Sequence, residues 1–337
     1  MIMALLPTHD AVVVTSPLTR PLHFLGLEIV VAVCFALTVL HVVRAYRRGD
    51  RYPAFQWLVI LAYGVLMELI AFTFYQNYEH AAFTVQLYRG QLPLYIPLVY
   101  IVFHYTGLKA VERLHLGAAA EALLVGFAIT LLDVPFDVVG VAAGWWSWSA
   151  HDPNLAHRWL GVPVTSYYGY LVFGAVFALL SRALRRRVEG RPLAAYVGLA
   201  PLVALAIVAL GIVAFVPFHV LVALGAGPGV IVAAHLAACA ALAMMVRPTR
   251  AEPPPRFVVQ IAIVLPAWMA VVAVTLTLAS PGGDADRSAL LTRLLVTLAA
   301  AAGGLALARF LPLRPRPIGA AGAPPLTSAP ANRENGG

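Results

Sequence analysis

The chain has 337 residues, of which 61% are hydrophobic and 11% are charged, and its mean hydropathy is +0.84. Soluble globular proteins carry about 25% charged residues, so this composition excludes a water-soluble enzyme, a nucleic-acid-binding protein and a disordered chain. The net charge of +8 comes from 23 basic against 15 acidic residues. In a chain this apolar, a basic excess favours loops at a membrane surface over a nucleic-acid footprint. Cys34 and Cys239 lie in separate apolar runs and are predicted to be buried thiols.

Apolar runs follow one another along most of the chain. A bilayer core of about 30 Å requires about 20 apolar residues per helix. The runs predict an all-α polytopic membrane bundle of about nine transmembrane helices within residues 22–311. The sixth and seventh runs are separated only by Pro217, His219 and a glycine-rich turn at 225–229, so a count of eight stays open. The predicted runs are 22–43, 55–75, 92–109, 118–136, 164–184, 194–216, 226–246, 258–279 and 289–310.

The two ends of the chain differ from the apolar runs. Residues 1–21 are predicted to be a short extramembrane segment and not a secretory signal, because Met1–Leu6 has no basic flank and ends at Pro7. Residues 312–337 are rich in Pro, Gly and Ala and predict a disordered cytoplasmic tail.

The basic residues are distributed unevenly between the predicted loops. Five of the 23 fall on the side of the predicted bundle at which the first run begins: Arg20, Arg89, Arg158, Arg287 and Arg293. The other eighteen follow the odd-numbered runs. Positive residues concentrate on the cytoplasmic side of membrane proteins, so the N-terminus is predicted outside and the C-terminus in the cytoplasm. The predicted location is the cell membrane, in a bacterium the inner membrane, with membrane lipids as partners. The eighteen are Arg44, Arg47, Arg48, Arg51, Lys109, Arg113, Arg182, Arg185, Arg186, Arg187, Arg191, Arg247, Arg250, Arg256, Arg309, Arg314, Arg316 and Arg333.

Three acidic residues fall in or beside apolar runs. Asp133 and Asp137 are four residues apart and would share a helix face, although Pro135 lies between them. Glu68 lies inside the second run, with Phe72, Tyr75 and Glu79 following at helical spacing. Ionising a carboxyl group in such surroundings is costly, and intramembrane acids commonly mark functional sites. We predict a proton donor among the three. The alternative for Asp133 and Asp137 is that they cap the helix end or pair with Arg158, and the alternative for Glu68 is structural pairing with a Tyr or His on a neighbouring helix.

Aromatic residues accompany the acids. Trp145, Trp146 and Trp148 follow Asp137 closely and form either part of an interfacial aromatic belt or a wall around a hydrophobic or cationic species. Tyr100 and His104 form an i, i+4 pair on the third helix. They are either a polar seam between helices or a contact to the substrate.

The histidines raise the question of a metal site. His80, His151, His157 and His219 all fall on the predicted outer side, near Glu79 and Asp152. Two His and a carboxylate can bind zinc or iron, but no pair has the i, i+4 helical spacing of specific motifs. We therefore predict no metal site.

The segment 131–170 resembles the prokaryotic multi-span carotenoid biosynthesis membrane protein family, which includes carotenoid hydratases and enzymes of C50 carotenoid formation. In that family an acid-bearing helix end leads into a Gly- and Trp-rich stretch, a Gly-Val-Pro turn and another helix. Glu68 is similar to the family's helix-two acid, and Leu92–Pro97 to its Pro-rich start of the next helix. The likeness covers about residues 60–185. The matching pieces are Asp133, Asp137, Gly144-Trp145-Trp146-Ser147-Trp148, Gly161-Val162-Pro163 and Tyr167-Tyr168-Gly169.

The resemblance implies an intramembrane enzyme with an isoprenoid or carotenoid substrate and no redox cofactor. One of Asp133, Asp137 and Glu68 would protonate a carbon–carbon double bond, and the resulting cation would be quenched by water or by ring closure. The tryptophans would shelter the cation, with Tyr167 and Tyr168 as further substrate contacts. A non-enzymatic lipid or small-molecule transporter, or a membrane scaffold, remains the alternative.

Overall fold

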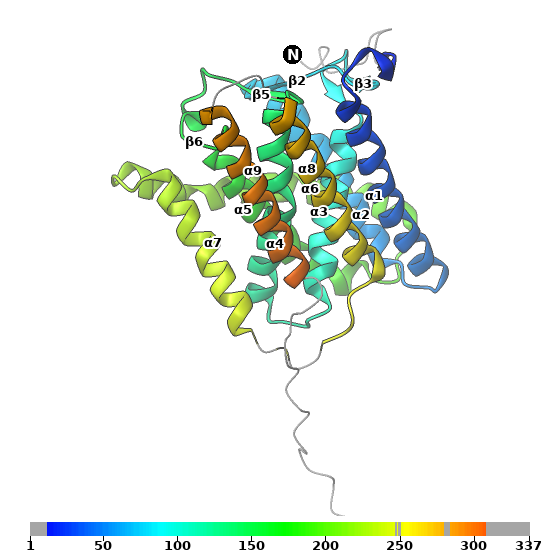
Figure 1. Ribbon diagram of the computed structural model, residues 1–337. Coiled ribbons are helices and arrows are strands. Elements are labelled where there is room, and N and C mark those ends of the chain that lie inside the picture. Colours follow the sequence, from blue (N-terminus) through cyan, green and yellow to red (C-terminus); the bar gives the residue numbers. More distant parts are fainter. Residues whose placement is uncertain (1–11, 247, 249–250, 280–283, 308–337) are drawn as a thin grey trace, which may run out of the picture.

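The computed structural model describes residues 12–246, 248, 251–279 and 284–307. Nine α-helices lie in this part of the chain (Figure 1), and each overlaps one of the nine predicted runs. The sixth and seventh runs are thus separate helices. The predicted tail at 312–337 lies outside the described residues. The helices are α1 (Leu22–Arg47), α2 (Tyr52–Ile70), α3 (Tyr95–Glu112), α4 (Ala118–Ala142), α5 (Val164–Val188), α6 (Leu193–Ala223), α7 (Pro228–Met245), α8 (Arg256–Ala279) and α9 (Asp284–Leu305).

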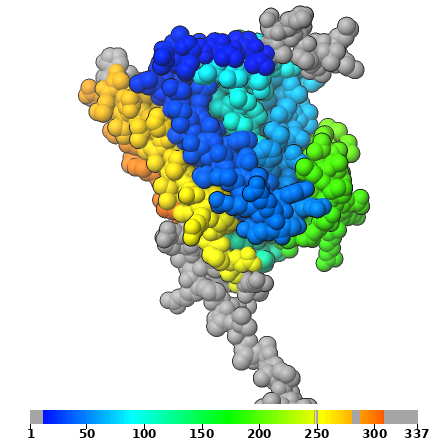
Figure 2. All heavy atoms as spheres, turned by 90° about the vertical axis from the view of Figure 1, so that its right-hand side faces the viewer, coloured from blue at the N-terminus to red at the C-terminus, as the bar shows by residue number. Residues whose placement is uncertain are grey.

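Eight of these helices are long and apolar enough to cross a membrane, and the exception is α3. Lys109 and Glu112 lower its hydropathy, and it packs against α1, α2, α4 and α8. α4 also lies centrally, against α3, α5, α7, α8 and α9. The peripheral α1 lies on the face seen in Figure 2, and its Ile29, Val33 and Leu40 are exposed. Exposed aliphatic side chains suit a lipid environment, and the prediction of an all-α membrane bundle is confirmed.

Short strands close the end of the bundle at which α1 begins (Figure 1). They form three small antiparallel sheets that link the loop before α3 to the loop before α5 and to the N-terminal segment. β1 (Val12–Val14), β3 (Val85–Leu87) and β4 (Leu92–Pro93) make one sheet. β2 (Tyr78–His80) pairs with β5 (Trp146–Trp148), and β6 (Arg158–Trp159) pairs with β7 (Val162–Pro163).

The helical spacing expected from Glu68 to Glu79 is not found. The π-helix η3 (Ala71–Tyr75) follows α2, and it ends at Gln76, whose φ of 48° is in the left-handed region. The chain then enters β2, where Glu79 is exposed opposite Ser147. Glu68 and Glu79 therefore do not share a face.

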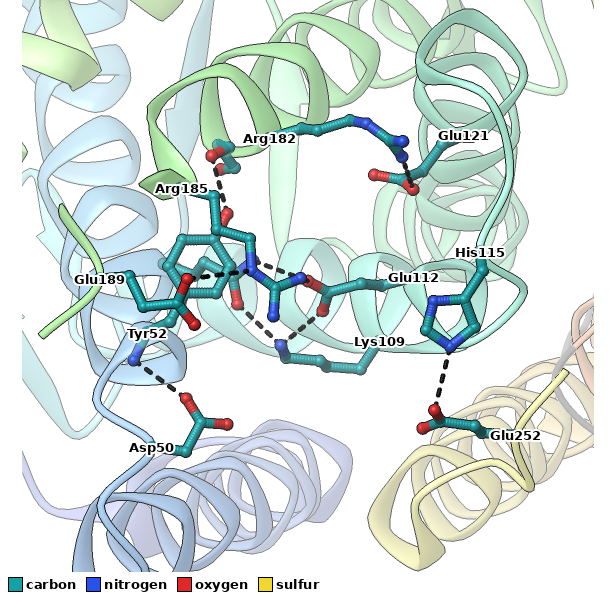
Figure 3. A network of polar contacts seen from close by, with 12 residues as sticks. Asp50, Tyr52, Lys109, Glu112, His115, Glu121, Arg182, Arg185, Glu189 and Glu252 are labelled. Carbon is teal, nitrogen blue, oxygen red and sulfur yellow. Dashed lines mark hydrogen bonds and ion pairs between the residues drawn. The ribbon is translucent and has the colours of Figure 1, made fainter. Parts of the chain in front are cut away.

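The basic turns meet at the opposite end of the bundle. Lys109 Nζ donates to Gln56 Oε1 at 2.7 Å and to Glu112 Oε2 at 2.6 Å, and Arg185 lies 4.0 Å from Glu112. Arg182 pairs with Glu121 across the α4–α5 interface. These contacts join α2, α3, α4 and α5 (Figure 3). The clustering at one end agrees with the predicted loop alternation, and which side of the membrane this end faces stays a prediction.

Candidate functional site

A cavity of about 470 Å³ lies beneath the strand-bearing end of the bundle. Its walls come from α2, η3, α3, α4, α5 and α6, and β2 and β5 contribute to its cover. Most of the residues around it are aliphatic or aromatic, with a few polar groups between them. This is the usual character of a small-molecule site.

Glu68 lies in the last turn of α2, where the helix passes into η3. Its side chain is buried and accepts a hydrogen bond from the Tyr78 hydroxyl, at 2.7 Å from Oε2. His80 Nε2 lies 3.8 Å from the same oxygen. Tyr78 and His80 are neighbours on one face of β2, so a single strand brings both side chains to the end of α2. π-Helical turns of this kind are frequent at functional sites.

Tyr78 shows the electrostatic character of this wall. Burial, followed by the nearby Glu68 carboxyl group and then Asp137, raises the pKa of the Tyr78 phenol well above its ordinary value. The phenol therefore stays protonated and acts as a hydrogen-bond donor to Glu68. Because both carboxyl groups act on Tyr78, it lies within electrostatic reach of each.

Asp137 comes to the cavity from α4, a different helix. It is buried, and its Oδ2 accepts a hydrogen bond from Ser166 Oγ at 2.8 Å, in the first turn of α5. α4 continues through Pro135 without interruption. Glu68 and Asp137 thus line one cavity from two helices. The bonds to Tyr78 and Ser166 each occupy one oxygen, so neither bond uses the second carboxyl oxygen.

Asp133 lies one turn before Asp137, but it does not line the cavity. It is fully buried, and the Asp137 carboxyl group and the Tyr170 side chain both act on its carboxyl group. Tyr170, which does line the cavity, is within electrostatic reach of Asp133, Asp137 and Glu68. The structural alternative of a pair with Arg158 is not found, because Arg158 donates to the carbonyls of Leu155, Trp148 and Ser149.

The three tryptophans separate into two groups. Trp146 and Trp148 line the cavity from β5, and Trp146 stacks on Phe136 with ring centroids 5.0 Å apart. The close approach of Trp146 to α4 requires Gly140, where a Cβ would lie 2.1 Å from the ring. Trp145 instead points toward α1, where its Nε1 donates to His23 Nδ1 at 3.0 Å, and it does not line the cavity.

Of the other predicted substrate contacts, only Tyr100 lines the cavity. His104 lies one turn after Tyr100 on α3, and the centroids of the two stacked rings are 5.8 Å apart. Tyr167 and Tyr168 lie outside the lining, and their hydroxyls donate to the carbonyls of Trp159 and Ala214.

Several lining residues were not among the sequence candidates. Ser166 donates a hydrogen bond to Asp137, and Tyr78 donates one to Glu68. Each donor is at least ten residues from its acceptor in the sequence, so the sequence alone does not indicate the pair. α6 contributes Ile212, Phe215 and Val216, which no sequence pattern distinguishes from lipid-facing residues. Among the described residues, no group of three His, Cys, Asp or Glu side chains is arranged to hold a metal ion.

The cavity reaches the apolar side of the bundle between η3 and α6. Tyr75, Ile212 and Val216 line it and are also 59%, 54% and 54% exposed. The cavity is therefore open to the outside of the bundle at these residues.

The profile of a family described as a domain of unknown function, DUF7802, matches residues 18–236. The chain belongs to this family. The DUF7802 region extends from the start of α1 into α7, and it contains every residue that lines the cavity. No curated protein and no solved structure matches the chain.

Proposed function

We propose that this membrane protein binds an isoprenoid-like lipid in the cavity and modifies one of its carbon–carbon double bonds by acid-initiated hydration or cyclisation. The observation that carries the proposal is the presence of Glu68 and Asp137, from two helices, in one largely apolar cavity beside Trp146 and Trp148. The resemblance of residues 131–170 to the carotenoid family supports the same chemistry.

Asp137 is the proposed proton donor. Apolar surroundings favour the neutral form of a carboxyl group, and only that form can donate a proton. The proton forms a C–H bond with the π electron pair of the double bond, which leaves a cation on the neighbouring carbon. The faces of Trp146, Trp148 and Phe136 stabilise that cation, because aromatic rings attract positive charge.

Glu68 is the proposed proton acceptor. It accepts a hydrogen bond from Tyr78, and in its carboxylate form it would take up the proton that the next step releases. In hydration, a water oxygen bonds to the cation and its proton passes to a carboxylate. In cyclisation, the electron pair of a second double bond closes the ring, and a carbon-bound proton is lost to a carboxylate. Either route conserves charge without a redox cofactor.

Expression in a carotenoid-producing host tests the proposal. Pigments are separated by chromatography for the wild type, Asp137→Asn, Glu68→Gln and the control Glu79→Gln, an exposed acid on β2. We expect a new pigment with the wild type and the control, and its loss in the other two variants at equal protein level.

Unchanged pigments in all four strains would overturn the carotenoid assignment. A pigment or prenyl lipid that copurifies with the protein unchanged would favour the non-enzymatic carrier instead.

A further inference from the structure

The charge of the cavity wall restricts what can bind. Glu68, Asp137 and Asp152 line the cavity, and no Lys or Arg is among its described lining residues. His80 and His219 are the wall's basic groups. Proteins that bind phosphate place Arg, Lys or free helix N-termini against it. A diphosphate in this largely apolar enclosure would lie beside acidic side chains with no Lys or Arg among the described lining residues to neutralise it, and burying an unpaired charge is costly.

One feature of the wall favours an anion, and an acidic side chain lies beside it. The N-terminus of α5 faces the cavity through Thr165 and Ser166, and helix N-termini attract negative groups. Ser166 Oγ is bonded to Asp137, and Thr165 Oγ1 donates to the Asn154 carbonyl. The acidic side chain of Asp137 therefore already lies beside this helix end.

The wall is suited to an uncharged end group. The phenol rings of Tyr63, Tyr100 and Tyr170 line the cavity together with the two carboxyl groups. These groups can donate hydrogen bonds to a hydroxyl and accept them from it, while the rings contact a hydrocarbon. Tyr75, Ile212 and Val216 line the cavity and are exposed at its opening between η3 and α6, so the remainder of a long lipid chain can leave the cavity there.

We propose that the cavity takes the uncharged end of a long isoprenoid, an alcohol or a hydrocarbon, and discriminates against the same chain ending in a diphosphate. This inference rests on the proposed function only for the isoprenoid nature of the bound lipid. The chain leaves the cavity laterally between η3 and α6.

The test is a displacement assay on the full-length protein in nanodiscs of zwitterionic lipid. Radiolabelled geranylgeraniol is bound first and then displaced by unlabelled geranylgeraniol or by geranylgeranyl diphosphate, at matched mole fraction in the bilayer. We expect that displacing half of the bound label requires a mole fraction of the diphosphate at least about tenfold higher than that of the unlabelled alcohol. Equal or better displacement by the diphosphate, or no saturable binding of the alcohol, overturns the inference.

Charge variants show whether the acids cause the discrimination. The ratio of interest is the mole fraction of diphosphate needed for half-displacement divided by that of the alcohol. Combining Glu68→Gln, Asp137→Asn and Asp152→Asn should lower this ratio, whereas Glu79→Gln should leave it unchanged. A ratio that survives in the triple variant, with alcohol binding intact, contradicts the electrostatic cause. If the triple variant is unstable, Asp152→Asn alone should narrow the ratio to a smaller extent.

This assay is independent of turnover. Selective binding of the alcohol with no product in the expression host overturns the proposed reaction and leaves the inference standing. Conversion of a substrate that ends in a diphosphate would overturn the inference and leave the proposed reaction standing.

Discussion

Tyr78 and Glu68 are joined by a 2.7 Å hydrogen bond between a strand and the end of a helix. The bond ties the cover of the cavity to one of its two acids. β2 is held in turn by β5, in the register that places Tyr78 opposite Trp148 and His80 opposite Trp146. The acid on α2 and the tryptophans on β5 are therefore positioned by one strand pair.

Replacing Tyr78 tests this coupling. Tyr78→Phe keeps the ring against Trp148 but removes the donor to Glu68. Leaving a buried hydrogen-bonding group without its partner costs about 1–3 kcal/mol, so we expect turnover to fall by about ten- to a hundredfold while the protein stays folded. Infrared difference spectra of the carboxyl region should show the Glu68 band shift. Tyr46→Phe, on the exposed part of α1, is the control, and an equal loss there would contradict the assignment.

The contact between α4 and α5 depends on glycine. A Cβ at Gly126 would lie 2.0 Å from the Leu171 carbonyl oxygen, whereas one at Gly198 on α6 would meet nothing within 4 Å. We expect Gly126→Ala to lower the free energy of unfolding by about 1–3 kcal/mol through overpacking. Gly198→Ala should be neutral or stabilising, since alanine is the better helix former by about 1 kcal/mol. Thermal unfolding in detergent compares the two, and equal behaviour would refute the close contact.

The helices were predictable because bilayer thickness imposes a length on every apolar run. All nine predicted runs contain a helix, although α3 is less apolar than the rest. Glu68, Asp137, Trp146 and Trp148 were also found from sequence, because intramembrane acids and clustered tryptophans are unusual. The strand pairings were not predictable, because β2 pairs with β5 across almost seventy residues of sequence. Tyr78 was not recognised as a site residue, because the helical spacing was expected to continue past Gln76. Trp145 was grouped with its neighbours, yet the turn at Gly144 directs it to α1.

Lys109 stabilises the opposite end of the bundle. It is the chain's one lysine, it is 8% exposed, and it bridges Gln56 and Glu112. Lys109→Met would leave Glu112 with the more distant Arg185 and the 3.4 Å hydrogen bond from Gln56 Nε2. We expect a loss of about 3–5 kcal/mol, the usual cost of breaking a buried pair. Arg186→Met, at an exposed position, should change stability little. Adding Glu112→Gln to Lys109→Met should recover part of the loss, and an additive result in the double variant would contradict the pairing.

The lateral opening makes a prediction about access. Val216 and Leu205 lie on α6 with 54% and 56% exposure, but only Val216 lines the cavity. Val216→Trp should narrow the opening and slow the exchange of bound geranylgeraniol by about tenfold or more, whereas Leu205→Trp should not. Exchange is followed by release of the radiolabelled alcohol after dilution into empty nanodiscs. Equal exchange rates in the two variants would mean that the bound lipid leaves the cavity by another route.

Orientation can be decided by labelling, because both native cysteines are buried. Ala150, after β5, and Arg186, near the end of α5, are both exposed and lie at opposite ends of the bundle. The concentration of basic residues near Arg186 predicts that this end is cytoplasmic. A membrane-impermeant maleimide should then label Ala150→Cys in intact cells and label Arg186→Cys only after permeabilisation. The reverse pattern would place the strand-bearing end and its cavity on the cytoplasmic side, and the lipid would then be bound from the inner leaflet.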